Sequence, residues 1–132
     1  MSYQKLLTLE VKLLKNETGV KKVYLRYLAL TQALDSSAAP GAMDETQKRL
    51  LELIAIRHAD GNAITVSEAM GAAFIASPAT IHRKLDALRE SGLIAPMFEG
   101  TNRRTKYLVP TQEADTYFHK LGLLIHQALK ES

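Results

Sequence analysis

Residues 77–92 read Ser-Pro-Ala-Thr-Ile-His-Arg-Lys-Leu-Asp-Ala-Leu-Arg-Glu-Ser-Gly, and this stretch carries a helix signal at each end. Ser77 can cap the first turn, and Pro78 suits the first helical position, where no amide hydrogen is needed. Gly92 can adopt the left-handed conformation that ends a helix. The stretch therefore predicts one helix with defined ends, and the rest of the chain is interpreted around it.

The two faces of this helix differ in chemistry. Ile81, Leu85 and Leu88 fall at i, i+4 and i+7, so they share a face and are expected to pack inward. The opposite face carries Ala79, Arg83, Asp86 and Glu90. Thr80 and His82 lie on the flanks of this face. Its N-terminal half is small, polar and basic, whereas its C-terminal half is acidic. This asymmetry is typical of a helix that enters a DNA groove by its N-terminal end.

The residues before this helix predict two more helices. Asp44 and Gln47 form a capping pair for a helix to His58, with inward Leu50, Leu51, Leu53 and Ile54. Ala63 and Ile64 are expected to form a very short strand. Thr65-Val-Ser-Glu68 is a capping box that starts a helix to about Phe74, whose buried side would carry Ala69, Met70, Ala73 and Phe74. A tight turn at residues 75–76 would then lead into the helix at 77–92.

The residues after Gly92 predict a hairpin. Residues 93–99 and 105–109 have strand character, and the loop at 100–104, Gly-Thr-Asn-Arg-Arg, joins them. Pro96 argues that the first strand lies at an edge or is bulged. The order helix, short strand, helix, turn, helix, hairpin is that of a winged helix-turn-helix. The predicted fold is mainly α with a small β-hairpin wing.

Outside this domain the chain is helical in pattern. Residues 20–34 form a firm amphipathic helix, and residues 35–42, rich in small residues with a Pro-Gly pair, read as a loop. Residues 3–15 fit both a strand and a helix, and we favour the helix. From Thr111 to the C-terminus, apolar residues repeat along one stripe. We therefore expect an N-terminal arm and linker at 1–42, a DNA-binding domain at 43–111 and a C-terminal helix at 112–132, with both outer parts serving dimerisation.

Composition sets the broad class. The 132 residues are 46% hydrophobic and 23% charged, as expected of a soluble globular protein of one ordinary domain. No apolar run is long enough to cross a bilayer and no signal-peptide pattern opens the chain, so a cytoplasmic location without membrane binding is expected. The absence of cysteine excludes disulfides and thiolate metal sites. The net charge is +3, and residues 77–111 hold six Lys or Arg against three Asp or Glu, which is a mild footprint for nucleic acid.

The candidate DNA-contacting residues lie on the helix and on the wing. Arg83 can donate bidentately to guanine or clamp a phosphate, and Ser77 and Thr80 can contact phosphate near the helix N-terminus. Arg103 and Arg104 bring two charges to the tip of the wing. The full set of predicted contact residues is Ser77, Thr80, His82, Arg83, Lys84, Arg103, Arg104 and Lys106. For His82, Lys84 and Lys106, ordinary surface positions are an equal alternative.

Residues 45–118 resemble the MarR-type (multiple-antibiotic-resistance regulator) winged helix-turn-helix transcription factors. The resemblance rests on Thr65-Val-Ser-Glu68, on Ser77-Pro-Ala-Thr-Ile-His-Arg83, on Ser91-Gly-Leu-Ile94, on Asn102-Arg-Arg104 and on Leu108-Val-Pro-Thr111. Asn102 and Pro110 stand where that family has Asp and Leu. The resemblance implies a homodimer, built from interlocking N- and C-terminal helices, on a pseudo-palindromic site. It also implies a small aromatic molecule as a candidate effector.

Other functional classes have little support in the sequence. There is no glycine-rich phosphate loop, no Ser/His/Asp order and no pair of carboxylates in an apolar setting, so we expect no enzyme. His58, His119 and His126 lack acidic or cysteine partners at ligand spacing, so no metal or other cofactor is expected. The main hypothesis is a sequence-specific, double-stranded DNA-binding transcriptional regulator, a dimeric repressor. The alternative is a winged-helix protein-interaction module without specific DNA binding, which the low net charge and the acidic Asp86 and Glu90 would suit.

Overall fold

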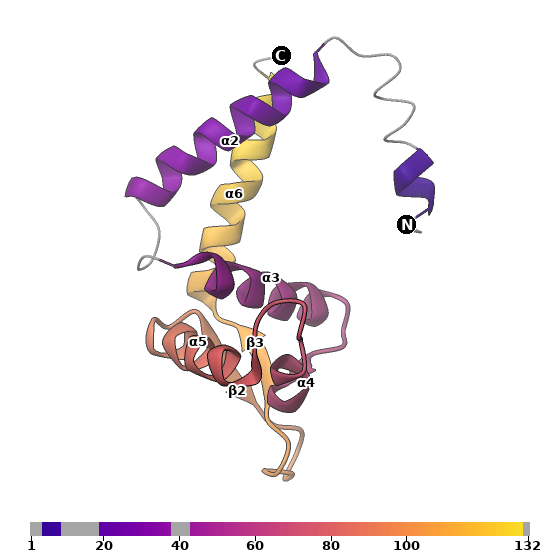
Figure 1. The fold of residues 1–132 in the computed structure, drawn as a ribbon, viewed down its shortest axis with the longest axis vertical. Helices are drawn as coiled ribbons and strands as arrows, with labels where there is room; N and C mark the ends of the chain where they lie inside the picture. Colours follow the sequence, from indigo (N-terminus) through magenta and orange to yellow (C-terminus); the bar gives the residue numbers. More distant parts are fainter. Residues whose placement is uncertain (1–3, 9–18, 38–42, 131–132) are drawn as a thin grey trace. The chain divides into compact units, whose positions relative to one another are not determined.

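The computed structural model describes residues 4–8, 19–37 and 43–130, and the chain divides into two compact units (Figure 1). The winged-helix unit spans Ala39–His119, and the arm unit combines Met1–Ala38 with Lys120–Ser132. After a helical stretch at residues 4–8, the elements are α2 (Val20–Ser37), α3 (Glu45–Ala59), β1 (Ile64–Thr65), α4 (Val66–Met70), α5 (Pro78–Glu90), β2 (Ile94–Met97), β3 (Tyr107–Pro110) and α6 (Gln112–Lys130).

Helix α3 begins and ends where its sequence signals predict. The Asp44 side chain accepts a hydrogen bond from the Gln47 amide at 2.8 Å, and the Gln47 side chain accepts one from the Asp44 amide at 2.8 Å. This reciprocal capping box satisfies two amides that a helix start leaves without intrahelical partners. The helix ends at Ala59, and Gly61 follows with a positive φ of 72°. The predicted helix and its cap are therefore confirmed.

Helix α4 starts at the predicted capping box but ends earlier than expected. Thr65 and Glu68 cap it reciprocally at 3.1 Å, yet it stops at Met70 and not near Phe74. Gly71 follows, which is a poor helix residue, and the chain then turns through the bonds Ala73 N–H to Gly71 C=O (2.9 Å) and Ile75 N–H to Ala72 C=O (2.9 Å). The expected burial of Ala73 and Phe74 is wrong, because both side chains are exposed, Phe74 by 69%.

Helix α5 matches the prediction closely. Ser77 is its N-cap, Pro78 its first residue and Ser91 its C-cap, and Gly92 follows with a positive φ of 78°. Ile81, Leu85 and Leu88 are buried, as their spacing predicts. The helix is therefore fixed along one side and offers the other side to solvent.

The wing forms the larger part of a three-stranded antiparallel sheet in the order β1-β3-β2. Ile94 lies opposite Pro110 and Met97 opposite Tyr107, while Ile64 of β1 lies opposite Leu108. Both wing strands are shorter than predicted, because the chain beyond the Met97–Tyr107 pair runs into the exposed loop. β1 lies one residue further along the chain than predicted. The edge position expected for the Pro96 strand is confirmed.

The core of the winged-helix unit lies where α3 and α5 meet the sheet. Its largest fully buried side chains come from α3, α5 and the residue before β2, namely Leu50, Leu51, Ile54, Ile81, Leu88 and Leu93. Thr111 links the start of α6 to the segment between α5 and β2. Its hydroxyl donates to the Gly92 carbonyl at 2.6 Å, and its amide donates to the Leu93 carbonyl at 3.1 Å. The core therefore fixes α5 and the base of the wing together.

The arm unit contains α2 and the C-terminal part of α6. The Arg26 guanidinium donates to the Ala128 carbonyl at 2.9 Å. Helix α2 continues to Ser37, so the loop predicted at 35–42 is wrong for residues 35–37, since an established helix adds such residues at a cost of only tenths of a kcal/mol each. Residues 4–8 are helical as favoured; the rest of the predicted 3–15 helix and loop residues 38–42 lie outside the described residues. None of the described helices has the length and apolar character that crossing a bilayer requires.

Two carboxylates in the capping boxes also tie neighbouring helices together. Lys84 of α5 pairs with Asp44, and this hydrogen bond and the amide of Gln47 hold the pKa of Asp44 below its usual 3.8. The amide of Thr65 and the guanidinium of Arg57, 3.1 Å away, likewise hold the pKa of Glu68 below its usual 4.5. The charged forms are therefore favoured in the folded chain.

The two lowered pKa values predict that the winged-helix unit becomes less stable in acid. A carboxyl whose folded pKa is depressed stabilises the fold above its unfolded pKa, and this contribution is lost as pH falls through the folded pKa. We expect the urea midpoint of unfolding to fall from about pH 5 downward, and Asp44→Asn with Glu68→Gln to flatten this fall. Glu99→Gln on the exposed wing is the control and should leave the slope unchanged. An equally steep fall in the double variant would contradict the prediction.

Candidate nucleic-acid interface

The exposed N-terminal half of α5 carries a linked row of polar side chains. The Ser77 hydroxyl lies 3.0 Å from that of Thr80 and accepts from the Thr80 amide at 3.4 Å. The Arg83 guanidinium in turn donates to the Thr80 hydroxyl at 3.3 Å. Because these residues are three apart, they lie along one side of the helix. Arg83 is thereby held near the helix N-terminus, where no acidic residue occupies the first turn.

Lys84, the next predicted contact residue, is engaged elsewhere. Its ammonium pairs with Asp44, the N-cap of α3, and its side chain is about two-thirds buried. Arg83 and Lys84 are thus neighbours in sequence with different surroundings, because successive residues on a helix point about 100° apart. The structure does not bring Lys84 together with the other predicted contacts.

Asp86 contacts two neighbours, His82 and Arg89, on the side of α5 that faces the wing. The His82 Nδ1 atom lies 3.5 Å from one Asp86 oxygen, and the Arg89 guanidinium lies 3.2 Å from the other. All three side chains are roughly half exposed. Arg89 was missed as a functional candidate in the sequence, although its i, i+3 spacing from Asp86 signals this pair. Asp86 offsets part of the positive charge at this end of the helix.

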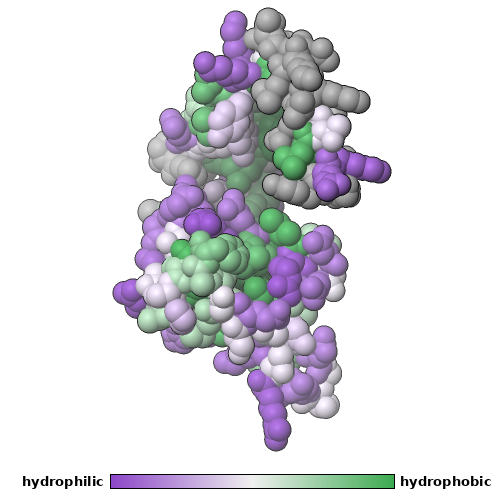
Figure 2. Space-filling model, turned by 45° about the vertical axis from the view of Figure 1, so that its right-hand side comes forward, coloured by the Kyte–Doolittle hydropathy of each residue, from purple (hydrophilic) through white to green (hydrophobic). Residues whose placement is uncertain are grey.

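The wing residues adopt distinct roles. The Arg103 guanidinium lies over the Phe98 ring, 5.1 Å from the ring centroid, which orients its charge by a cation–π contact. The Asn102 side chain accepts a hydrogen bond from the Arg104 amide at 3.0 Å and so fixes the turn. Hydrophilic side chains crowd the wing tip, at the bottom of the view in Figure 2.

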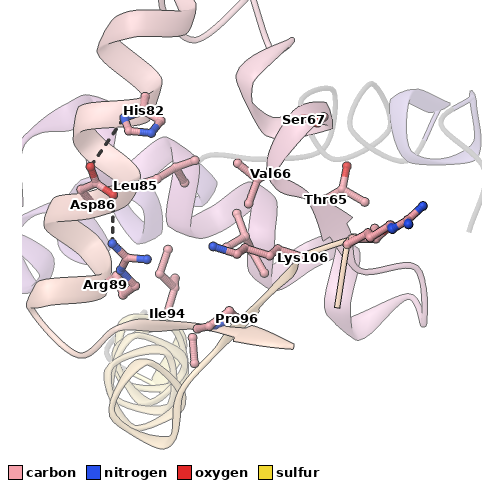
Figure 3. A pocket seen from close by; sticks show the side chains of 14 residues that line it. Thr65, Val66, Ser67, His82, Leu85, Asp86, Arg89, Ile94, Pro96 and Lys106 are labelled. Atoms are coloured by element: carbon pink, nitrogen blue, oxygen red, sulfur yellow. Dashed lines mark hydrogen bonds and ion pairs between the residues drawn. The ribbon is translucent and has the colours of Figure 1, made fainter. Parts of the chain in front are cut away.

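A groove of about 320 Å³ separates α5 from the wing. His82, Asp86 and Arg89 form its helix side, and Arg104 and Lys106 contribute to its opposite side. In Figure 3, Lys106 extends across this groove toward the wall that carries Asp86 and Arg89, above an apolar base that includes Ile94 and Pro96. Three predicted contact residues, His82, Arg104 and Lys106, are therefore brought together here.

A metal site requires several ligand side chains close together. Within residues 4–8, 19–37 and 43–130, no three His, Cys, Asp or Glu side chains gather in a way that could hold a metal ion. His58 lies in the last turn of α3, and His119 and His126 lie on α6. The candidate site is accordingly a polar and basic surface, and the chemistry that it offers is hydrogen bonding and charge pairing.

The chain is similar in fold to several solved structures of known proteins. No protein-family model and no curated protein matches the sequence. Among solved structures, a MarR-like transcriptional regulator from Thermotoga maritima is similar, with a TM-score of 0.54 and 18% identity over 87% of this chain and 81% of that one. The YusO protein from Bacillus subtilis gives a TM-score of 0.52 and 18% identity over 99% of this chain and 83% of its own.

A third structure, Streptococcus pneumoniae FabT in complex with DNA, gives a TM-score of 0.50 and 18% identity over 98% of this chain and 80% of its own. The chain has the fold of MarR-like transcriptional regulators. The predicted fold class and the resemblance noted in the sequence are thereby confirmed at the level of the fold.

Asn102 and Pro110, the two positions at which the sequence departs from the MarR-type pattern, lie at the wing turn and at the end of β3. Asn102 holds the turn by accepting a hydrogen bond from the Arg104 amide, and the Phe98 ring orients the Arg103 charge. Pro110 lies opposite Ile94 at the end of β3, and Thr111 directly after it makes the hydrogen bonds that lead into α6. Asn102 therefore fixes the wing turn, and Thr111 fixes the start of α6.

Proposed function

We propose that the chain is a sequence-specific, double-stranded DNA-binding transcriptional regulator that acts as a dimeric repressor. Helix α5 enters the major groove by its N-terminal end, and the wing loop at 100–104 contacts the DNA backbone or the minor groove. The observation that carries the proposal is the row Ser77–Thr80–Arg83, exposed at the N-terminus of α5 in the same compact unit as the basic wing.

The start of α5 suits a nucleic acid on chemical grounds. A helix N-terminus presents amide donors and a partial positive charge, and the hydroxyls of Ser77 and Thr80 add short donors that reach a phosphate. Arg83 provides a planar donor pair that matches either the edge of guanine or a phosphate. Base reading therefore depends mainly on Arg83, whereas Ser77 and Thr80 position the helix.

The wing supplies charge at a second point. Arg103 and Arg104 lie in an exposed loop, and Lys106 and Arg89 extend the positive surface into the groove beside α5. Contacts of this kind release counterions from DNA, so they raise affinity without reading sequence. Lys84 contributes least, because its ammonium already pairs with Asp44.

The similar structures support this proposal. FabT from Streptococcus pneumoniae shares the fold, and its structure contains DNA. PefR from Streptococcus agalactiae, a heme sensor with a TM-score of 0.51, shows that a protein of this fold can respond to a small molecule. A small-molecule effector therefore belongs to the proposal. A thermal-shift screen of small aromatic carboxylates and heme should give at least one stabilising ligand.

The arm unit supports the proposed homodimer. Large apolar side chains stay exposed on α2 and on the C-terminal part of α6, namely Val20, Tyr24, Leu25, Leu123, Ile125 and Leu129. Large apolar side chains exposed together on two helices commonly mark an association site, and a symmetric pairing would cover both helices at once. The arm at 1–42 and the helix at 112–132 are accordingly proposed as dimerisation parts.

The dimer proposal predicts that one charged substitution in the arm unit changes the mass of the particle in solution. Sedimentation of the wild-type chain should give twice the mass of one chain, and Leu129→Glu should shift it to monomer because the charge would be buried in the seam. Ile56→Glu, on the exposed side of α3, is the matched control and should stay dimeric. A monomeric wild-type chain at micromolar concentration would contradict the proposal.

The proposed function is tested by binding-site selection. Random duplexes are enriched on the purified full chain, and the affinity for the selected duplex is measured by fluorescence anisotropy across a salt series. We expect a pseudo-palindromic sequence and a Kd that rises steeply with salt. No affinity for any duplex at low salt, together with a stable protein partner in a pull-down, would instead support an interaction module. A reporter carrying the selected site upstream of a promoter distinguishes repression from activation.

A further inference from the structure

The turn before α5 exposes a large aromatic side chain that no proposed role so far requires. Phe74 is 69% exposed, the largest value among the exposed large apolar side chains of the described residues. Burying a phenylalanine ordinarily stabilises a fold, and the exposed Phe74 contributes little of that stabilisation. An exposed aromatic ring at this place is free to contact a partner that meets the start of α5.

The turn holds Phe74 in a defined place. The amides of Ala73, Ile75 and Ala76 donate to the carbonyls of Gly71 and Ala72, at 2.9, 2.9 and 3.4 Å, and Ala72 itself is buried. Phe74 therefore projects from a hydrogen-bonded turn anchored on the core. Apart from Ile75, the residues next to it in the chain are small, namely Gly71, Ala72, Ala73 and Ala76, so a large partner can approach this part of the backbone closely.

The position along the chain indicates what this partner is. Phe74 lies three residues before Ser77, so its Cα atom is at most about 11 Å from that of the N-cap. The end of α5 that this turn leads into carries Ser77, Thr80 and Arg83 and has no acid in its first turn. A duplex bound at the N-terminus of α5 would therefore lie within reach of the exposed Phe74 ring.

We propose that Phe74 contacts the C5-methyl group of a pyrimidine in the major groove, a thymine in unmodified DNA, and so determines sequence specificity at that position. This inference rests on the proposed function. The methyl group of thymine is the one apolar feature that a base pair displays in the major groove, and apolar side chains, Phe included, recognise it by contact. Phe74 thus adds apolar readout to the hydrogen-bonding readout of Arg83.

The test removes the methyl group from the DNA and the ring from the protein. In the selected duplex, each thymine is replaced in turn by uracil, which lacks only the C5-methyl, and Kd is measured for the full-length wild type and Phe74→Ala. Burying one methyl-sized group changes affinity by about fourfold. We expect one thymine per half-site whose replacement weakens wild-type binding by about that factor, and an equal affinity of Phe74→Ala for the two duplexes.

Controls separate this inference from the function on which it rests. Ile56→Ala removes another large exposed apolar side chain of the same unit, on α3, and should keep the wild-type preference for thymine. Phe74→Leu should keep part of it, because leucine is also apolar. Since Phe74 is exposed, its variants should unfold at the wild-type urea concentration.

The outcomes differ in what they overturn. If the wild type binds a selected duplex and Phe74→Ala retains every thymine-over-uracil preference, the inference is wrong and the proposed function stands. The same result with a loss of repression in a purified transcription reaction would assign Phe74 to a protein partner and overturn the inference too. If no duplex is bound at low salt, the proposed function and the inference fail together.

Discussion

Replacing Arg83 with alanine should weaken binding to the selected duplex by about 10- to 100-fold, which corresponds to removing one bidentate pair of hydrogen bonds. The guanidinium is held over the first turn of α5 by the Thr80 hydroxyl, 3.3 Å away, and so has little orientational freedom to lose on binding. If Arg83 binds a phosphate, the slope of log K against log salt should become shallower by about 1 in the variant. If it reads a guanine, discrimination at that base should relax.

Lys84 is the matched control for Arg83. It lies next to Arg83 on the same helix with the same charge, but its ammonium pairs with Asp44. Lys84→Ala should therefore leave DNA affinity within about twofold of wild type at a salt concentration that resolves Arg83→Ala. Arg104→Ala on the wing should lower affinity about equally for all sequences. If Arg83→Ala and Arg104→Ala both bind as the wild type does, the proposed docking geometry is wrong.

Leu88→Ala should lower the free energy of unfolding of the winged-helix unit by about 2–5 kcal/mol, a large part of the stability of a small domain. Leu88 is fully buried on α5, where it shares a core with residues of α3 and the wing base, so its truncation leaves a cavity that rigid neighbours cannot fill. Urea unfolding followed by circular dichroism measures the effect.

The exposed side of α3 supplies the comparison for Leu88. Ile56 is 61% exposed, and Ile56→Ala should change the free energy of unfolding by less than about 0.5 kcal/mol. Similar urea midpoints for Leu88→Ala and Ile56→Ala would show that the core is not where the burial of Leu88 indicates. Leu88→Ala and Ile56→Ala also serve as folding controls for the DNA measurements, since a partly unfolded variant would bind DNA weakly whether or not the substituted residue touches it.

Local signals in the sequence predicted the elements whose ends are marked chemically. The capping pairs Asp44–Gln47 and Thr65–Glu68 and the Ser77-Pro78 start each produced a helix at the expected residue. Helix ends without such a signal were predicted less well. Helix α2 runs past the small residues at 35–37, because propagation of an established helix outweighs their weak propensity.

The arrangement of the candidate site was only partly predictable. The sequence identifies the basic residues, and the pairing of Lys84 with Asp44 and the stacking of Arg103 on Phe98 arise from tertiary contacts that no local pattern encodes. The exposure of Phe74 was missed for a related reason. At helical spacing it continued the apolar side of α4, and only the early stop at Gly71 turns it to solvent.

Both free edges of the small sheet are protected against pairing with another chain. The outer strand β2 contains Pro96, which has no amide hydrogen to donate, and the opposite edge, β1, is only two residues long before it passes into α4. A row of unpaired backbone groups at a sheet edge is a template for aggregation, and neither edge offers one of useful length. The protein can therefore reach a high local concentration without the wings of neighbouring molecules joining into a continuous sheet.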